Sequence, residues 1–337
     1  FDYVDGIGWD GDFNGASYYA NVLDNHDPSL ILIAEADNPF QMNSTDFDSG
    51  WDYSYHHNMF DNVLDIYLDL NNVANHINAY SQGYSFVTGP INYTESHDES
   101  RLIYQATEFQ NQSFEEAYNR SKLSATLLFT SHGVPMIYSG QELGQCAPTR
   151  DSGGFPIQQP IQWDNLDIDL VQDLNNHYKK MIDLRNNTSV LKEPPLEVKY
   201  LDNNYKCFVY WRADQNEKVV IAINFDTVEK FLDLEFPNSG DWTNIVDDTQ
   251  ISIDSNWYGG FNLAPLSSYV FVPSALCSQG DLNSDTTINI VDIIALVNIV
   301  LSDEDPNDFQ NCAGDLSSDG IINIIDIIAL VNIILSQ

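Results

Sequence analysis

Three acidic residues stand where an apolar run ends and a polar turn begins: Asp2, Glu35 and Asp98. Glu35, for example, directly follows the apolar residues 30–34. A carboxylate at the C-terminal end of a buried parallel strand lies on the face of an α/β barrel where chemistry takes place. Breaking a glycosidic bond requires one carboxyl group as acid and a second as nucleophile or base. The pattern therefore predicts sugar chemistry at one end of a barrel.

The surrounding sequence has the alternation needed to position such carboxylates. From residue 1 to about 190, short apolar runs alternate with longer amphipathic stretches, as in repeated βα units. Beyond Pro194-Pro195, the runs are rich in Val, Ile, Tyr and Phe and are bounded by Asp, Asn and Gly, which predicts a small antiparallel β domain. We expect buried strands at 30–34 and 134–138, helices within 58–80, 113–130 and 170–185, and β-domain strands at 206–212, 218–224 and 268–272.

Composition limits the kinds of partner. Fifty acidic against thirteen basic residues give a net charge of −37, which repels nucleic acid and anionic membrane surfaces. No apolar run reaches the roughly 18 residues that a membrane span needs.

The chain contains four cysteines. Cys277 and Cys312 each precede one copy of an internal repeat, so a disulfide between them is an open possibility, and Cys146 and Cys207 are expected to be unpaired.

The C-terminal segment is an internal duplication. Residues 281–298 recur as 315–332, with oxygen-bearing side chains at loop positions 1, 3, 5, 9 and 12. Position 7 of such a loop contributes its backbone carbonyl, and the whole set is typical of Ca²⁺ rather than of zinc. The predicted ligands of two calcium ions are Asp281, Asn283, Asp285, Thr287, Asn289 and Asp292 in the first loop, and Asp315, Ser317, Asp319, Ile321, Asn323 and Asp326 in the second.

The two loops differ at position 6, which favours glycine for its sharp turn: Gly320 is present in the second copy and Thr286 in the first. Each loop runs into a helix without a helix before it, and this arrangement resembles the dockerin module, which binds two calcium ions and docks onto a cohesin partner. Positions 10 and 11, where dockerins commonly carry small hydroxyl residues, are Ile290-Val291 and Ile324-Ile325. The alternative is a pair of Asp-rich surface turns.

Four segments of the first 190 residues resemble the α-amylase superfamily of retaining glycoside hydrolases, glycoside hydrolase family 13. Phe1-Asp2 is similar to the end of the strand 4 motif, and residues 33–37 (Ile-Ala-Glu-Ala-Asp) to the strand 5 motif. Residues 96–101 (Ser-His-Asp-Glu-Ser-Arg) are similar to the strand 7 motif, and residues 133–142 to the strand 8 segment. The resemblance covers residues 1 to about 273.

The resemblance implies a role for each carboxylate. Asp2 would be the nucleophile, Glu35 the general acid and base, and Asp98 a third carboxylate that holds ring hydroxyls. Each of these residues also has an alternative explanation when it is taken singly. Asp2 is typical of a solvated terminus, Glu35 of an acid at a helix N-terminus, and the His97-Asp98 pair of a turn with a cap. His97, Arg101, Trp51 and His56 are predicted to bind substrate, although the segment around Trp51 and His56 could equally be a packed loop.

The fold class that follows is α/β: a partial (β/α)8 TIM barrel comprising strands 4 to 8, a small antiparallel β-sandwich and a small α-helical, calcium-binding, dockerin-like module. The expected boundaries are residues 1–192, 193–273 and 274–337. Strands 1 to 3 would lie upstream of Phe1, so we expect a fragment of a longer enzyme that is inactive or poorly folded by itself.

The predicted function is hydrolysis of α-glycosidic bonds in a starch-like α-glucan by double displacement, with a calcium-binding docking tail. One alternative is a branching-type glucan transferase of the same superfamily, and another is an inactive glucan-binding or scaffold-binding fragment. The expected partners are an α-glucan and a cohesin-like or cell-surface protein. The expected location is extracellular or at the cell surface, as for a secreted protein of the bacterial type.

Overall fold

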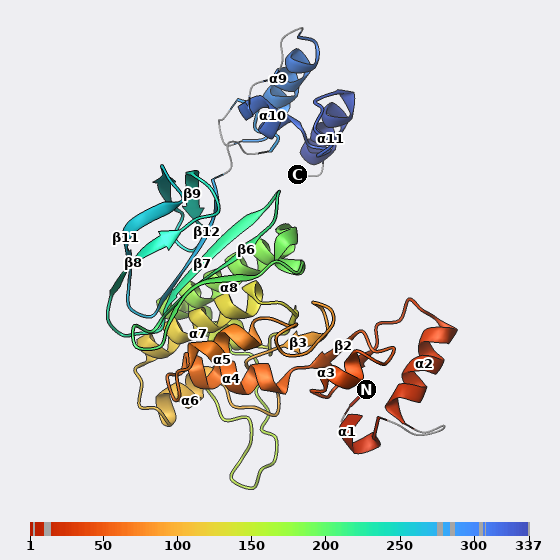
Figure 1. Cartoon of the computed structure of the whole chain (residues 1–337), viewed down its shortest axis with the longest axis vertical. Coiled ribbons are helices and arrows are strands. Elements are labelled where there is room, and N and C mark those ends of the chain that lie inside the picture. Colours follow the sequence, from red (N-terminus) through yellow and green to blue (C-terminus); the bar gives the residue numbers. More distant parts are fainter. Residues whose placement is uncertain are drawn as a thin grey trace. The chain divides into compact units, whose positions relative to one another are not determined.

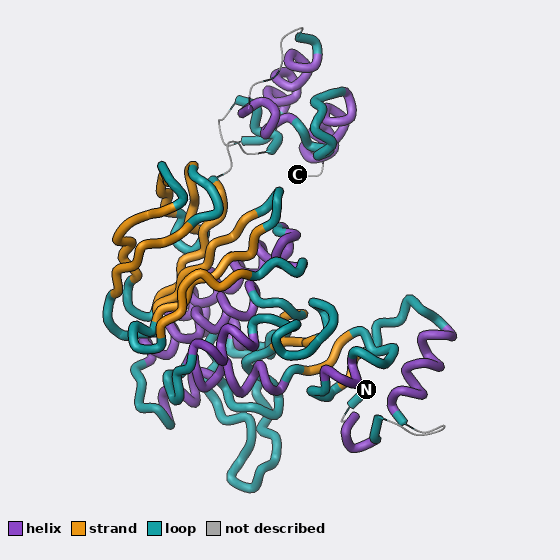
Figure 2. Tube along the Cα trace, in the orientation of Figure 1, coloured by secondary structure: helices purple, strands orange, loops and turns teal. Residues whose placement is uncertain are grey.

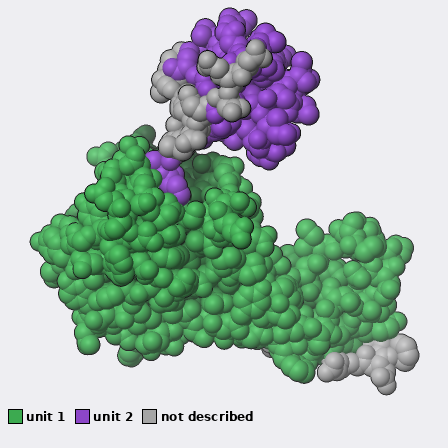
Figure 3. Space-filling model, turned by 45° about the horizontal axis from the view of Figure 1, so that its top comes forward, with its two compact units in different colours: residues 1–272 green, residues 273–337 purple. Residues whose placement is uncertain are grey.

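The computed structural model describes residues 1–2, 4–9, 15–274, 279–283, 287–302, 306 and 308–335. The chain divides into two compact units, Phe1–Val272 and Pro273–Gln337, which are coloured separately in Figure 3. Each unit has its own apolar core. None of the helices in the described ranges combines the length and the apolar character that crossing a bilayer requires.

The first unit contains a parallel sheet in which strands follow one another in chain order, β1-β2-β3-β4. Its strands are very short: β1 Ile33–Ala34, β2 Ser49–Trp51, β3 Pro90–Asn92 and β4 Val134–Pro135. Helices separate consecutive strands along the chain, as the βα alternation predicts (Figure 1). The carboxyl ends of all four strands therefore meet at one edge of the sheet.

Four helices of the first unit begin at a polar residue whose side chain caps the first turn. Asp52, Asp69 and Ser113 each accept a hydrogen bond from a backbone N–H of the first turn. The helices are α1 Val4–Ile7, α2 Ala16–His26, α3 Pro39–Met42, α4 Tyr53–Val63, α5 Leu70–His76, α6 Leu102–Glu108, α7 Phe114–Thr130 and α8 Asp169–Asn187, with short 3₁₀ turns at Gln141–Leu143, Trp163–Asp167 and Ser189–Lys192.

The predicted helices at 113–130 and 170–185 are confirmed by α7 and α8. The periodic stretch 58–80 instead holds the end of α4 and all of α5. The chain turns between them because Asp65 adopts a positive φ of 58° and Asn62 Oδ1 accepts a bond from the Asp69 backbone nitrogen (2.6 Å). The apolar periodicity of the sequence runs through this turn because α4 and α5 bury their apolar sides in the same core.

The prediction of buried strands at 30–34 and 134–138 is wrong in extent. Only two residues of each run are strand, and Ile31 is 78% exposed. β4 ends at Pro135 because Pro135 pairs with Asn92, which is the last residue of the partner strand β3. Hydrophobic composition favours a strand, but a ladder extends only as far as a neighbouring backbone offers hydrogen bonds.

The β domain consists of a six-stranded antiparallel sheet, in the order β10-β9-β12-β7-β6-β5, and a two-stranded sheet, β11-β8 (Figure 2). One face of the larger sheet packs on α7 and α8, and the other shares a core with the smaller sheet. The three predicted runs are confirmed as strands. The bounds are β5 Glu197–Asp202, β6 Cys207–Ala213, β7 Lys218–Asn224, β8 Lys230–Glu235, β9 Gly240–Asn244, β10 Thr249–Ile253, β11 Trp257–Leu263 and β12 Ser267–Pro273.

The described residues of the second unit contain three helices, α9 Ile290–Val300, α10 Asp308–Gly314 and α11 Ile324–Leu335. Its core contains Leu296 and Leu330, which are equivalent residues of the two copies, together with Leu282 and Ala313. Cys312 is disulfide-bonded, while Cys277 lies outside the described residues. The expectation that Cys146 and Cys207 are free thiols is confirmed.

Candidate active site

Backbone hydrogen bonds bring Asp2 beside Glu35. The backbone nitrogen of Phe1 donates to the Ile33 carbonyl (2.9 Å), and the Glu35 nitrogen donates to the Phe1 carbonyl (2.9 Å). This alternation is the pattern of a parallel pair, so Phe1 runs alongside β1 in the same direction. Asp2 and Glu35 are therefore presented at the carboxyl ends of neighbouring strands.

Both carboxylates line one cavity of about 270 Å³. Trp51, at the end of β2, and His97, a few residues beyond β3, line it as well. The Trp51 and His97 rings meet edge to face at 6.2 Å between centroids. The cavity is thus lined by four residues from four different segments, all of which the sequence analysis singled out. Two carboxylates lie beside an aromatic surface that suits a sugar ring.

Asp98 lies next to this cavity through its contact with His97. His97 Nε2 lies 3.3 Å from Asp98 Oδ2, and both side chains are about half-exposed. The other carboxylate oxygen of Asp98 is paired with Arg150, which the sequence analysis missed. Arg150 lies in the loop after the 3₁₀ turn Gln141–Leu143, 52 positions from Asp98, and nothing in its local sequence indicates this partner.

Arg101 does not bind at the cavity, contrary to the prediction. Its side chain is fully buried, and its guanidinium donates to Glu95 (3.1 Å), to Gln159 (2.9 Å) and to a backbone carbonyl. It also lies 4.0 Å from the centroid of the Tyr138 ring. Its charge therefore balances the buried Glu95 rather than the carboxylates of the cavity.

His56 is likewise not a lining residue. It is 3% exposed and its ring stacks on Tyr93 at 5.2 Å, so the packed-loop alternative describes it better than substrate binding.

Asp52, which follows Trp51, is a further carboxyl at the strand ends. Burial, and after it the nearby Asp37, raises the pKa of Asp52 to about 7. Its Oδ1 caps α4 by accepting from the Tyr55 nitrogen (2.7 Å).

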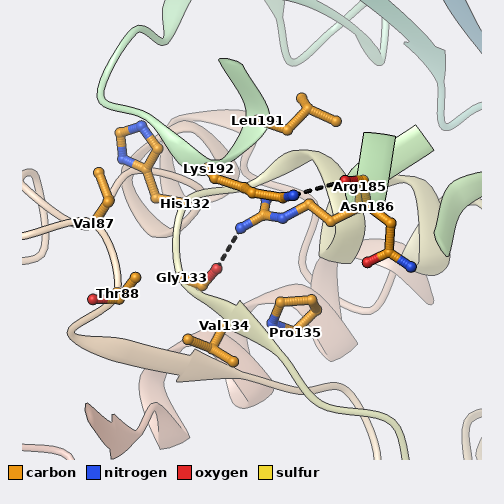
Figure 4. Close-up of a pocket in the computed structure, with 10 residues that line it drawn as sticks. All are labelled: Val87, Thr88, His132, Gly133, Val134, Pro135, Arg185, Asn186, Leu191 and Lys192. Atoms are coloured by element: carbon orange, nitrogen blue, oxygen red, sulfur yellow. Dashed lines mark hydrogen bonds between the residues drawn. The ribbon is translucent and has the colours of Figure 1, made fainter. Parts of the chain in front are cut away.

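A second cavity, of about 260 Å³, lies at the opposite, amino-terminal ends of β3 and β4 (Figure 4). Arg185 faces it, but its guanidinium donates to the carbonyls of Phe129, Ser131 and Gly133. Lys192 likewise donates to the Asn186 carbonyl. This end of a barrel is the one that serves stability, and the cations here are already engaged by backbone.

The two loops of the repeat have matching hydrogen bonds. In the first, Asp292 accepts from the nitrogens of Leu282 (2.8 Å), Asn283 (3.3 Å) and Asn289 (2.9 Å). In the second, Asp326 accepts from Ser317 (2.9 Å) and Asn323 (2.8 Å). The Asp at loop position 12 thus folds back over its own loop in both copies.

Asn289 and Asn323, predicted as ligands, act here as caps. Their Oδ1 atoms accept from the second residue of α9 and α11 respectively, both at 2.8 Å. Their amides donate to the carbonyls of Thr287 and Ile321, both at 3.0 Å. Asp285 lies outside the described residues.

The chemistry of this donor set fits a hard cation. Asp281, Asp292 and Asp326 are almost completely buried, and the sequence contains no Lys, Arg or His after Lys230. Buried carboxylates are normally paired with a cation or bind a metal. Burial by itself would raise the pKa of Asp326, but the backbone bonds from Asn323 and Ser317 lower it overall, which keeps an anionic oxygen in the loop.

Residues 19–216 match the family described as alpha amylase, catalytic domain, and residues 198–274 match the alpha amylase C-terminal all-beta domain. A cyclomaltodextrinase from Bacillus sp is 22% identical over 213 residues, which is 62% of this chain and 36% of that protein. An amylopullulanase from Thermoanaerobacter thermohydrosulfuricus is 27% identical over 214 residues, 57% of this chain and 14% of that protein.

Among solved structures, an Anoxybacillus α-amylase superposes with a TM-score of 0.63 at 16% identity, covering 77% of this chain and 56% of that one. The chain thus spans about a third of the cyclomaltodextrinase and about half of the solved α-amylase. Because the catalytic-domain match extends over more than half of the 337 residues, and the β domain follows it in the family's order, the chain belongs to the α-amylase family of glycoside hydrolases.

Proposed function

We propose that the protein containing this chain is a retaining α-glucan hydrolase of the α-amylase type. The observation that carries the proposal is that Asp2 and Glu35 line one cavity from neighbouring strand ends, with Trp51 and His97 on the same wall. A retaining mechanism needs two carboxyl groups flanking one bond. The family membership supports α-glycosidic bonds as the substrate.

In the proposed mechanism, Asp2 attacks the anomeric carbon while Glu35 donates its proton to the leaving glycosidic oxygen. The product is a glycosyl ester on Asp2. Glu35, now ionised, removes a proton from a water that attacks the same carbon and releases the sugar. Asp98, held by His97 and Arg150, accepts hydrogen bonds from ring hydroxyls and stabilises positive charge on the ring.

The test uses the protein extended upstream of Phe1 as the resemblance implies, with soluble starch as substrate. Asp2→Asn and Glu35→Gln should each lower the release of reducing ends by at least about a thousandfold, because each removes an obligatory group. Asp24→Asn, a carboxylate on α2 away from the cavity, is the matched control and should retain full activity. Undiminished activity of either active-site variant would disprove the assignment.

The same assay separates the alternatives. A glucan hydroxyl in place of water at the second step would make a transferase, and new α-1,6 branches without new reducing ends would identify it. Absence of both products from the unmodified protein would leave glucan binding as its activity.

We further propose that the second unit binds two calcium ions, one in each loop. The support is the all-oxygen donor set, the burial of Asp292 and Asp326, and the lack of any basic side chain in this segment. Calcium titration by calorimetry should give two equivalents for the native chain and one for Asp326→Ala. Equal stoichiometry in the two proteins would contradict the proposal.

The proposed role of this unit is docking of a dockerin type, to a cohesin-like or cell-surface partner. α9 and α11 expose equivalent apolar side chains, which fits a partner that buries them. The exposed set comprises Ile290, Val291, Ile294, Ile324, Ile325 and Ile328. Binding of a cohesin-like partner that is unaffected by the double change Ile290→Ser and Ile324→Ser would exclude this face.

We propose an extracellular or cell-surface location for the protein, of the bacterial secreted type. The disulfide at Cys312 supports this, because disulfides persist mainly in oxidising compartments. Fractionation of the producing cells, followed by immunodetection, tests it, and accumulation in the cytosol would contradict it.

A further inference from the structure

Two histidines and a glutamate meet beside the candidate active site without belonging to it. His56 and His57 lie in the first turns of α4, after β2, and Glu99 follows the His97-Asp98 pair beyond β3. One potential ligand atom from each of the three lies within 4.8 Å of the other two. The segments that carry them are separate in sequence and are brought together at the carboxyl ends of the parallel strands.

Backbone carbonyls orient both imidazoles. His56 Nδ1 lies 3.1 Å from the Thr94 carbonyl oxygen, and His57 Nδ1 lies 2.7 Å from the Tyr53 carbonyl oxygen. A carbonyl can only accept a hydrogen bond, so each Nδ1 carries the proton. Each Nε2 is then the ring's remaining ligand atom, which is the tautomer and support that metal-binding histidines usually have.

The spacing of the inner pair fits a small tetrahedral ion. His56 Nε2 lies 3.4 Å from Glu99 Oε2. Ligands bound at roughly 2.0–2.1 Å in a tetrahedron are about 3.3 Å apart, so the ion could enter with almost no movement of these two atoms. The His56 ring is held between Tyr93, at 5.2 Å, and Phe60, at 5.4 Å.

The outer part of the cluster is open to solvent. His57 is exposed and Glu99 is about one-third exposed, so an ion can reach the cluster and the His57 ring can adjust to it. Without an ion, Nε2 of His56 and Oε2 of Glu99 face one another directly.

We propose that His56, His57 and Glu99 bind one divalent transition-metal ion of the zinc class, with two imidazole nitrogens, one carboxylate oxygen and a water in the fourth position. Nitrogen ligands distinguish this site from the all-oxygen loops of the second unit, which suit calcium. The ion would tie α4 to the segment that holds His97 and Asp98. His56, His57 and Glu99 would thereby act as positioning residues for that segment.

The test is a zinc titration of the full 337-residue chain, first treated with chelator and then kept in excess calcium to fill the loops of the second unit. The native chain should bind one equivalent of Zn²⁺, and Co²⁺ in its place should give the visible absorption of a tetrahedral site. His57→Gln and Glu99→Gln should each weaken zinc binding at least about tenfold. His26→Gln, an exposed histidine at the end of α2, is the matched control and should bind as the native chain does.

A second measurement separates a specific site from general surface binding. At a zinc concentration about a hundred times the dissociation constant, the melting temperature of the first unit should rise by about 5 °C in the native chain and in His26→Gln. It should rise by no more than about half as much in His57→Gln, whose exposed position lets the variant fold. Absence of zinc binding by the native chain, or undiminished binding by both His57→Gln and Glu99→Gln, would overturn the proposal.

Discussion

Arg101 and Arg150 each pair with a carboxylate near the candidate site, but in opposite environments. The Arg101–Glu95 pair is almost completely buried, whereas Arg150 and Asp98 are each about 40% exposed. Burial raises the pKa of Glu95, and Arg101 opposes that rise. One arginine is therefore required to neutralise a charge inside the protein, and the other contributes mainly to the orientation of Asp98.

This difference predicts unequal losses of stability. Arg101→Met leaves the Glu95 carboxylate buried without its cation and should lower the free energy of unfolding by about 3–5 kcal/mol. Arg150→Met removes a solvent-screened pair and should lower it by less than about 1 kcal/mol. Urea unfolding at neutral pH measures both. Equal losses in the two variants would show that the buried pair is not structural.

At the scale of elements, one buried histidine joins three of them. His177 on α8 lies 2.9 Å from the Thr126 hydroxyl on α7, which lies 2.8 Å from the Ser268 hydroxyl on β12. Burial, reinforced by Lys122, lowers the pKa of His177 from 6.5 to about 3. The junction between the helical layer and the β domain therefore depends on a neutral imidazole.

The sign of the resulting pH dependence follows from linkage. Below about pH 6.5 the unfolded chain protonates this histidine and the folded chain does not, so stability falls as the pH decreases towards 3. Between pH 7 and pH 5 the loss from His177 should be about 2 kcal/mol. His177→Gln can keep a bond to Thr126 but cannot ionise, so its stability should fall by about 2 kcal/mol less over the same range. Identical pH dependence of the two proteins in urea unfolding would contradict this explanation.

At the scale of the whole molecule, the two units have separate cores and different charge composition. The first contains all thirteen basic residues of the chain, and the second contains none. Carboxylates gathered in the loops of the second unit repel one another unless a cation neutralises them. The folding of the two units should therefore respond differently to calcium.

Scanning calorimetry of the full chain should show two transitions. Calcium should raise the temperature of the one that belongs to the second unit, because binding to the folded form alone stabilises it, and chelator should lower it. The transition of the first unit should not move. Unfolding in a single transition, or a calcium shift of both, would show that the units do not unfold independently.

The sequence by itself determined most of the local structure and indicated the candidate residues for the chemistry. Strand-end carboxylates, helical periodicity at α7 and α8, the β domain and the duplicated loops are all local patterns, and each is read from residues near one another in the chain. The positions of Asp2 and Glu35 at neighbouring strand ends also follow from parallel order alone. These predictions needed no knowledge of long-range contacts.

Only the tertiary structure decided which charged groups face the cavity. Arg101 and His56 lie in segments of the expected kind but turn into the interior, and Arg150 reaches Asp98 from a distant loop. The tertiary structure also decided that Glu99 lies beside His56 and His57, which belong to another element. The direction of a side chain depends on which surface of its segment the rest of the chain covers. That is settled by packing between elements far apart in sequence, which no local pattern encodes.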